Sequence, residues 1–389
     1  MASPTHRIQS LLNSRNAGIG SALLAAIVLI GTTGCGGGFF VPTCQETNSC
    51  GGGNGTYSSF AYVANATTGT LAGFPVPTAA FTTLTGTTYS LGTTPSALAA
   101  TPNGAFLYVS TIAGNIFVYT IGTNGALTLG NGGSPVVQAL YPTWMTIDPS
   151  GNWLFEVSKS SSQMQIFQIN TSTGVITQSS QGSVQLSAGN PTQIYVTPNN
   201  QFVYIGLGPG GTDGFTFNSN TGVVSAKTHI VPRNGASDNT FAADGTSTYL
   251  FVGEAGSGIR VLTIGAGGSP QEVTGSPFTS QLGPQSIVVD PSNTYVYVAN
   301  RTANVITGYT LGTDGTLTPL SGSPFSTGSA PNAMSLDSTG KYLFVVNSGG
   351  SPDMQVFSFD STTPGKLDSV TSVATGTDPT GAVALSVVP

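Results

Sequence analysis

The sequence predicts an all-β protein, and three observations support this. Only 6% of the 389 residues are charged and 39% are hydrophobic, so the chain can bury a large core. Short strand-like runs of aromatic and apolar residues recur at a regular spacing from residue 57 onward. The first and last repeats are both incomplete, and each has the strand that the other lacks. A closed ring of small sheets accounts for all three observations.

Seven copies of one strand define the repeat. The third residue of this strand is aromatic in every copy, and successive copies lie 46, 47, 49, 47, 46 and 47 residues apart. Periods of this length are typical of propeller blades or solenoid turns. The seven aromatic residues are Tyr62, Tyr108, Phe155, Tyr204, Phe251, Tyr297 and Phe344.

Each repeat contains four strand-like runs. An inner strand begins thirteen residues before the aromatic residue, usually at a proline, which suits a strand start because no ladder donor is needed there. In the fifth repeat Asp238 takes that place. A turn such as DPSG from Asp148 leads to the aromatic strand, and a third strand and an outer edge strand follow. We therefore expect four antiparallel strands in each repeat.

The two ends of the repeat region decide between a ring and an open solenoid. The first repeat begins at Tyr57 with its aromatic strand, and the last segment, residues 379–389, is an inner strand with nothing after it. We expect this segment to pair beside Phe60–Ala64 and so to complete the first sheet. Such closure removes free sheet edges. The prediction is a seven-bladed β-propeller over residues 57–389, closed by the C-terminal strand.

Residues 1–34 predict a signal peptide of the lipoprotein type. A basic start precedes a 14-residue apolar run, Ala17 to Ile30, which is short for a membrane span but suits a signal peptide. Small residues then lead to Cys35, as at the site where bacterial lipoproteins are cleaved and lipidated. We expect an exported protein, anchored through Cys35 to a periplasm-facing membrane or the cell surface. Ordinary secretion and an uncleaved anchor are the alternatives.

Residues 35–56 are rich in glycine and predict a flexible tether. Cys44 and Cys50 lie in this stretch, where an oxidising compartment would allow them to close a small disulfide loop. A metal-binding pair is the weaker alternative, because no histidine or further cysteine lies close to them.

Charge and composition exclude several classes of function. Without residues 1–34 the chain has seven Lys and Arg against 15 Asp and Glu, a net charge of −8, which offers no footprint for nucleic acid. No metal-ligating cluster or phosphate-binding loop is present in the sequence pattern, and we expect no cofactor. Once residues 1–34 are removed, His229 is the single histidine, so no Ser-His-Asp set can be proposed.

The repeat resembles that of a known family. The segments PQSIVVDPSNTYVYVANR, from Pro284, and PNAMSLDSTGKYLFVVN, from Pro331, are similar to the YVTN-type repeat of the lactonase family, with its 6-phosphogluconolactonase-like and cycloisomerase-like propellers. The resemblance extends over residues 57–389. It implies a seven-bladed propeller and, as a function, hydrolysis of a small lactone. Because function resides in sites rather than folds, the repeat says more about architecture than about chemistry.

One departure from the family pattern bears on that chemistry. Members with lactone or cycloisomerase activity commonly have histidine directly after the inner-strand proline, with arginines and an acidic residue nearby. No histidine stands at these positions here, which are Ser96, Thr143, Thr192, Asn239, Gln285, Asn332 and Thr380.

Charged residues gather on one predicted face around the fifth and sixth repeats. In a propeller, the loops that enter inner strands and the loops that leave aromatic strands open on the same face. His229, Arg233, Glu254 and Arg301 all belong to such loops. The arginines could hold a carboxylate or an oxyanion, and His229 or Glu254 could activate water. The alternative is a set of solvated loop charges, including a weak Glu254–Arg301 surface pair.

Uncharged polar residues complete the predicted ligand site on the same face. They are Asn300, at the end of the sixth aromatic strand, and Asn239 and Gln285, directly after the starts of the fifth and sixth inner strands.

Glu156 breaks the apolar pattern of the aromatic strand, because every other repeat has Val or Ile in its place. An unpaired buried carboxylate would cost several kcal/mol, so this side chain should be paired, hydrogen-bonded or protonated. Lys159 or a tyrosine is a possible partner, and a satisfied structural carboxylate is the simplest interpretation.

Two functions remain open from the sequence. The first is an exported hydrolase acting on a small lactone or another anionic ligand. The second is a non-catalytic cell-envelope propeller that binds a small molecule or a protein partner. A phosphorylated sugar lactone fits poorly, because the chain has few cations and such metabolites do not leave the cytoplasm freely.

Overall fold

The computed structural model describes residues 57–78, 86–137, 141–158, 161–233, 235–265, 270–373 and 382–389. The predicted signal peptide, the tether and the three cysteines lie outside these residues, so lipidation and the disulfide stay predictions. Within the described residues, no helix is long and apolar enough to cross a membrane.

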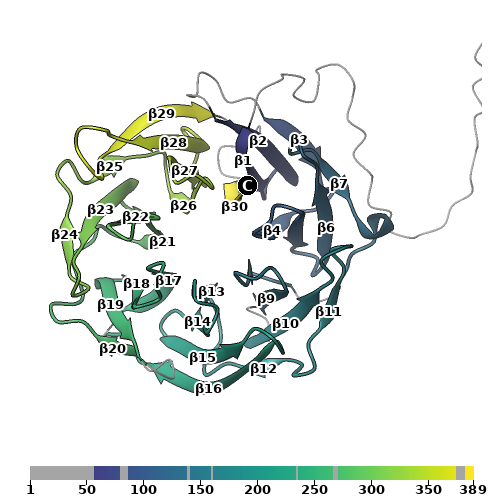
Figure 1. Cartoon of the computed structure of the whole chain (residues 1–389), viewed down its shortest axis with the longest axis horizontal. Helices are drawn as coiled ribbons and strands as arrows, with labels where there is room; N and C mark the ends of the chain where they lie inside the picture. The colour runs from purple at the N-terminus through teal and green to yellow at the C-terminus, as the bar shows by residue number, and fades with distance from the viewer. Residues whose placement is uncertain are drawn as a thin grey trace, which may run out of the picture. The chain divides into compact units, whose positions relative to one another are not determined.

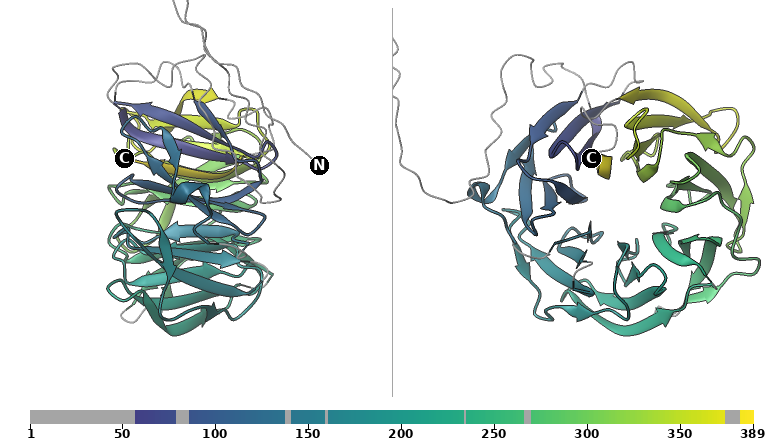
Figure 2. Two further views of the ribbon diagram at one scale, coloured as in Figure 1. Left: turned by 90° about the vertical axis from the view of Figure 1, so that its right-hand side faces the viewer. Right: turned by 180° about the vertical axis from the view of Figure 1, so that it is seen from behind.

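Seven antiparallel sheets form the blades of a ring (Figure 1). Figure 2 shows the ring edge-on and from behind. Each blade has four strands in the order inner, aromatic, third and outer, and blades 3 and 6 add a short strand on the third. The predicted seven-bladed β-propeller is therefore confirmed.

The strands of the first four blades run from the inner to the outer position. Blade 1 has β30 (Ala382–Val388), β1 (Tyr57–Asn65), β2 (Thr70–Pro77) and β3 (Thr87–Ser90). Blade 2 has β4 (Pro95–Ala100), β5 (Phe106–Thr111), β6 (Ile116–Ile121) and β7 (Leu127–Leu129). Blade 3 has β8 (Trp144–Ile147), β9 (Trp153–Ser158), β10 (Gln163–Ile169), β11 (Ile176–Gln178) and β12 (Val184–Gln185). Blade 4 has β13 (Gln193–Val196), β14 (Phe202–Gly206), β15 (Thr212–Asn218) and β16 (Val223–Ile230).

The last three blades repeat this order. Blade 5 has β17 (Ser237–Ala243), β18 (Tyr249–Ala255), β19 (Gly258–Ile264) and β20 (Pro270–Glu272). Blade 6 has β21 (Pro284–Val289), β22 (Tyr295–Asn300), β23 (Val305–Leu311), β24 (Leu317–Pro319) and β25 (Phe325–Ser326). Blade 7 has β26 (Pro331–Leu336), β27 (Tyr342–Asn347), β28 (Met354–Phe359) and β29 (Leu367–Val373). We call the face where inner strands begin and aromatic strands end the upper face.

Ring closure follows the prediction. β30 is antiparallel to β1, with partners from Phe60 and Val388 to Asn65 and Ala382. In Figure 1 the two strands lie side by side, one from each end of the described chain. The C-terminal strand thus supplies the inner strand of the first blade.

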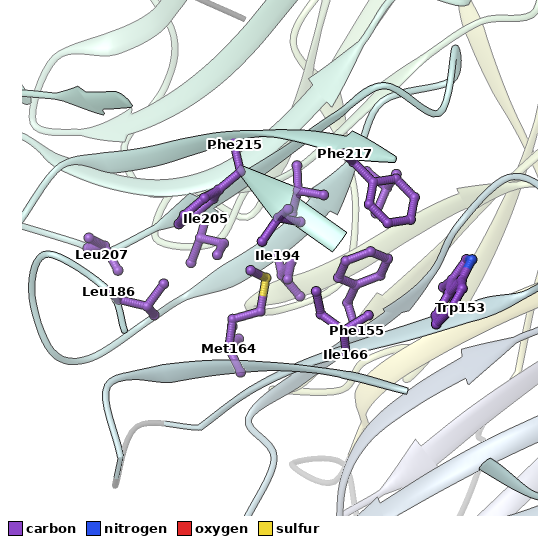
Figure 3. Packing of buried hydrophobic residues seen from close by; sticks show 14 residues of the cluster. Trp153, Phe155, Met164, Ile166, Leu186, Ile194, Ile205, Leu207, Phe215 and Phe217 are labelled. Atoms are coloured by element: carbon purple, nitrogen blue, oxygen red, sulfur yellow. The ribbon is translucent and has the colours of Figure 1, made fainter. Parts of the chain in front are cut away.

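Side chains alternate between the two faces of each blade and pack against both neighbouring blades. In β9, Phe155 and Val157 contact blade 4, whereas Leu154 packs toward blade 2. Figure 3 shows the cluster between blades 3 and 4, where the Phe155 and Phe217 rings meet edge to face with centroids 5.0 Å apart. Strands that are buried on both faces explain why their sequences are almost continuously apolar.

At the repeated aromatic position, the tyrosines of blades 1, 2 and 6 each donate a hydrogen bond to a turn of the following blade. The hydroxyl of Tyr62 donates to the carbonyl of Gly125 at 2.7 Å, and that of Tyr297 donates to Gly365 at the same distance. Each acceptor is a glycine with positive φ in the turn between the third and outer strands of the following blade. Both the aromatic period and the regular turn glycines therefore serve the joints between blades.

Candidate functional site

The start of the inner strands carries a recurrent β-bulge at the upper face. The pairing with the aromatic strand skips the second residue of the inner strand in blades 2, 6 and 7, and the third residue in blade 5. A bulge redirects the extra side chain, which is why bulges occur often near active sites. The bulged residues are Ser96, Asn239, Gln285 and Asn332, so two predicted ligand residues stand at such positions. Asn239 and Gln285 are half-buried, and Asn239 accepts a hydrogen bond from Ser237 at 3.0 Å.

His229 lies on the outer strand of blade 4, next to its upper end. Its Nδ1 is 2.9 Å from Oδ1 of Asp213, which is fully buried on the neighbouring strand β15. The imidazole itself is 38% exposed. A buried carboxylate therefore fixes one ring nitrogen, while the side chain still reaches solvent.

A second β-bulge creates this contact. The pairing of β15 with β16 shifts between Gly214 and Thr216, and Ala226, in the unpaired stretch opposite, has a φ of 50°. Without the shift, Asp213 would pair with Thr228, and His229 would point to the other side of the strand. The extra residue is thus what places the imidazole against Asp213.

Asp213 is surrounded by donors. Burial alone would raise its pKa, but a hydrogen bond from the Ser187 backbone N–H, the contact with His229 and the charge of Lys227 together hold its pKa below the usual range. The Lys227 ammonium is 3.2 Å from Oδ2, and the Ser187 N–H is 2.7 Å from the same atom. Asp213 is therefore ionised at neutral pH and can only accept hydrogen bonds from His229.

Glu254 is fully buried between blades 4 and 5 and is not a surface group. Its Oε1 is 3.4 Å from Arg260 of β19, and its strand partner is Asp238 of β17. Asp238 accepts a hydrogen bond of 2.6 Å from Thr212 in blade 4. The ion-pair partner of Glu254 among the described residues is Arg260, so the alternative of a Glu254–Arg301 surface pair is wrong.

The two predicted arginines have separate partners. Arg233 contacts the Glu272 carboxylate and donates to the Ser276 carbonyl at 2.8 Å, both in blade 5. Arg301 is exposed and donates to Oδ1 of Asn332 in blade 7 at 2.5 Å. Glu272 therefore links Arg233 to Arg260, because its carboxylate contacts both side chains. Arg301 lies instead at the joint between blades 6 and 7.

Asn300 is fully buried and serves the strand around it. Its amide donates to the Val298 carbonyl at 2.9 Å and to Thr307 at 3.1 Å, and its Oδ1 accepts from Ser280 at 2.9 Å. The Asn300 side chain therefore stabilises the strands around it, and its amide group is occupied by contacts within the protein.

Glu156 is buried between blades 2 and 3, on the same side of β9 as Leu154. Its Oε2 has no hydrogen-bond partner among the described residues, and burial raises its pKa to about 8. Lys159 lies outside the described residues. A protonated carboxyl at neutral pH is the state that this environment favours.

A cavity of about 350 Å³ lies at the lower ends of the inner strands of blades 4 to 7. Its walls include Tyr195, Ala242, Val288, Asn293 and Met334. None of the predicted site residues lines it. In the part of the chain that the structure describes, no three His, Cys, Asp or Glu side chains gather in a way that could hold a metal ion.

Sequence reasoning missed four charged partners of the predicted residues. Asp213 and Arg260 lie inside strands, where the repeat pattern gives no sign of a site. Glu272 ends an outer strand, and Asp238 was visible only as the residue that replaces a proline. Assigning strand partners along the β15–β16 hairpin could have suggested Asp213 as the neighbour of His229, but only if the bulge were already known.

Comparison with known proteins places this geometry in a family. The model of the family described as "Lactonase, 7-bladed beta-propeller" matches residues 55–192 and 187–384. No curated protein has a sequence that matches this chain significantly.

Solved structures with the same fold have low sequence identity to the chain. A candidate 6-phosphogluconolactonase from Bacteroides uniformis has a TM-score of 0.70 at 16% identity, covering 86% of this chain and 100% of that one. A protein from Lactobacillus plantarum has a TM-score of 0.66 at 19% identity, with the same coverage. The periplasmic gluconolactonase PpgL from Pseudomonas aeruginosa has a TM-score of 0.64 at 15% identity, covering 85% and 99%. The family match extends over most of the chain, which therefore belongs to the lactonase family of seven-bladed β-propellers.

Proposed function

We propose that this chain is an exported, lipid-anchored lactonase that hydrolyses a small lactone outside the cytoplasm, with His229 as the general base. The observation that supports this most directly is the 2.9 Å contact between His229 Nδ1 and Asp213 Oδ1. Because the carboxylate only accepts, the proton of the neutral ring is held on Nδ1, and Nε2 is left to accept one. An imidazole oriented by a buried carboxylate is a recurrent general base.

The proposed reaction balances with water alone. Nε2 takes a proton from water as the water oxygen bonds to the lactone carbonyl carbon. The ring C–O bond then breaks, and the imidazolium returns the proton to the leaving alkoxide oxygen. The product is the open hydroxy acid. Arg233, in the loop that follows the strand of His229, is a candidate to hold the oxyanion or the product carboxylate.

The substrate class follows from charge. The chain without residues 1–34 has a net charge of −8, and each predicted arginine already has a partner in the protein. A lactone without phosphate fits this surface better than a phosphorylated one. The Pseudomonas propeller that is described as a periplasmic gluconolactonase gives a precedent for such a location. Arg301, Asn239 and Gln285 are further candidates for ligand contacts at the upper face.

Hydrolysis of a lactone panel tests the proposal. Base consumption would be followed for glucono-1,5-lactone, its 6-phosphate and γ-butyrolactone with the intact protein and with His229→Gln, Asp213→Asn and Lys341→Gln. Lys341 is exposed in a lower-face turn and serves as the matched surface control. We expect the first two variants to lose about 100-fold or more of the rate, as for other general bases, and the control to keep it. Hydrolysis no faster than the spontaneous rate, or full activity of His229→Gln, would refute the catalytic role.

A non-catalytic binding propeller is the second candidate, and one observation favours it. Glu254 is completely buried and both predicted arginines are bonded within the protein, so fewer groups than expected face a substrate. Calorimetric titration with the same lactones and their hydroxy acids separates the two functions. Binding of a lactone without turnover by the intact protein would favour the binding role.

A further inference from the structure

The joint between blades 4 and 5 holds two carboxyl groups that face each other without a donor between them. Asp238 and Glu254 are direct strand partners on β17 and β18. They are 1% and 0% exposed. Among the described residues, no donor bonds to Asp238 Oδ1 or to Glu254 Oε2. The Nε–H of Arg260 likewise has no acceptor among these residues. Three unpartnered polar atoms in one buried cluster are unusual, because buried polar groups are nearly always satisfied.

A proton resolves the contact between the carboxyls. Two ionised carboxylates can only accept hydrogen bonds, so these strand partners can satisfy each other's free oxygens only if one of the two carboxyls carries a hydrogen. Burial and the neighbouring Glu254 charge also raise the pKa of Asp238 to about 6, against the opposing effects of Thr212 and Arg260. Such a pair takes up and releases its proton as a unit.

The charged groups that the structure describes around the pair belong to blade 5 and to the loop that leads into it. Arg260 of β19 contacts Glu254 at 3.4 Å, and its other nitrogen is 3.4 Å from Glu272 of β20, which in turn contacts Arg233. Blade 4 contributes the uncharged hydroxyl of Thr212 at Asp238 itself. Further along the same joint lie the phenols of Tyr204 and of Tyr195, whose oxygen accepts from the Ala243 N–H at 3.0 Å. Burial raises the pKa of both tyrosines, that of Tyr195 to about 12, so they stay neutral.

The pair also lies where the two blades are joined through the backbone. Asp238 N donates to Gly208 O at 3.0 Å, and Gly208 N donates to Asp238 O at 3.2 Å. Arg260 donates to the carbonyl of Val231 at 2.9 Å, in the upper-face loop that directly follows His229. A change of charge on the pair therefore acts on both the joint and this loop.

We propose that Asp238 and Glu254 share one proton and act as a pH-sensitive latch that holds blade 4 to blade 5 and, through Arg260, fixes the loop after His229. Loss of the proton leaves two repelling carboxylates in a buried joint and pulls Arg260 away from the Val231 carbonyl. The latch itself does not depend on any activity. Its effect on hydrolysis rests on the proposed function, because only then does the loop border a catalytic base.

The sign of the pH effect follows from the raised pKa. The folded state keeps a proton that the unfolded chain releases near pH 3.8, so the free energy of unfolding falls as pH rises through the window between about 4 and about 6. Glu156 titrates in an overlapping window, so the test uses the Glu156→Gln background throughout.

Thermal melting and hydrogen exchange test the latch without any assay of activity. In the Glu156→Gln background, we expect the melting temperature to fall by a few degrees between pH 4 and pH 7. Asp238→Asn and Glu254→Gln, each added separately, should flatten this slope, because an amide supplies the donor that the proton provided. The amides of Asp238 and Gly208, which bond across the joint, should lose protection with pH, after correction for intrinsic exchange, only when both carboxyls are present.

Thr212→Val gives a separate variant in case the amides fail to fold. This variant removes the hydroxyl that donates to Asp238 and stabilises its ionised form. The pH range over which the melting temperature falls should therefore move to higher pH. An unchanged slope in Asp238→Asn, or a window that stays in place in Thr212→Val, would overturn the latch. Loss of hydrolysis with an intact pH slope would instead count against the proposed function alone.

Discussion

Phe60 of the first blade pairs with Val388, the second-to-last residue of the chain, and this contact closes the ring. Val388 is 3% exposed and belongs to the same apolar cluster as Phe60 and Tyr62. The closure thus combines a strand ladder with a packed core, and no other described strand could take the inner position of blade 1.

Removal of the last strand should open the ring. Deletion of residues 382–389 exposes the edge of β1 and the apolar faces of blades 1, 2 and 7, so we expect a fall of the melting temperature by more than 10 °C or loss of soluble protein. Val388→Ala, which keeps the ladder and removes only packing, is the matched control and should cost about 1–3 kcal/mol. A truncated protein that melts like the intact one would show that blade 1 does not depend on this strand.

The tyrosine bonds between blades should each contribute measurably. Tyr297→Phe removes the hydroxyl that donates to the Gly365 carbonyl and leaves this acceptor unsatisfied, so we expect a loss of about 1–2 kcal/mol. Tyr141→Phe is the control, because the Tyr141 side chain is 50% exposed. Equal unfolding midpoints in urea for the two variants would contradict a role of the hydroxyl in the joint.

The fold was predictable because the same physical requirement recurs in every blade. A strand buried on both faces needs apolar residues throughout, and the joint to the next blade needs an aromatic residue that reaches the next turn, as Tyr62 reaches Gly125. A repeated requirement leaves a period in the sequence. The closure was predictable for the same reason, since the missing inner strand of blade 1 was visible as a gap in that period.

The site was only partly predictable, because its contacts are not repeated. His229 and Arg233 were predicted as rare charges in an upper-face loop, but the structure places His229 on β16, and their partners Asp213 and Glu272 lie on other strands. The bulge at Ala226, which turns His229 toward Asp213, changes the register by one residue and leaves no mark in the apolar pattern. Whether Glu254 is exposed or buried depends on how blade 5 packs against blade 4, which no local pattern records.

Lipidation of Cys35 remains a prediction from the sequence. Mass spectrometry of the mature protein from a bacterial host should find residue 35 as the N-terminus, with the mass of an attached lipid, in the membrane fraction. Cys35→Ala should release the protein from the membrane or leave its signal uncleaved, because the thiol is the point of attachment. A soluble mature protein that begins elsewhere and is unaffected by Cys35→Ala would exclude the anchor.

Glu156 should make the protein less stable as the pH rises, and the sign can be worked out. Its pKa is raised from 4.5 to about 8 by burial, so the folded state holds a proton that the unfolded chain has already lost. Stability is therefore complete below about pH 4.5 and falls as the pH rises toward 8, by up to roughly 3–5 kcal/mol in total. Burial and the neighbouring Glu254 raise the pKa of Asp238 to about 6, so Asp238 is largely ionised between pH 6.5 and 8.5 and this range reports mainly on Glu156.

Two substitutions at this position separate the charge from the shape. Glu156→Gln keeps the volume and removes the titration, so its melting temperature should stay nearly constant from pH 6.5 to 8.5 while that of the intact protein falls. Glu156→Val restores the residue type of the other blades and should be at least as stable as the intact protein at pH 8. Parallel pH profiles for the intact protein and Glu156→Gln would mean that the carboxyl is already ionised and paired in the fold. A valine variant that is much less stable than both would mean that the carboxyl group has a structural partner between blades 2 and 3.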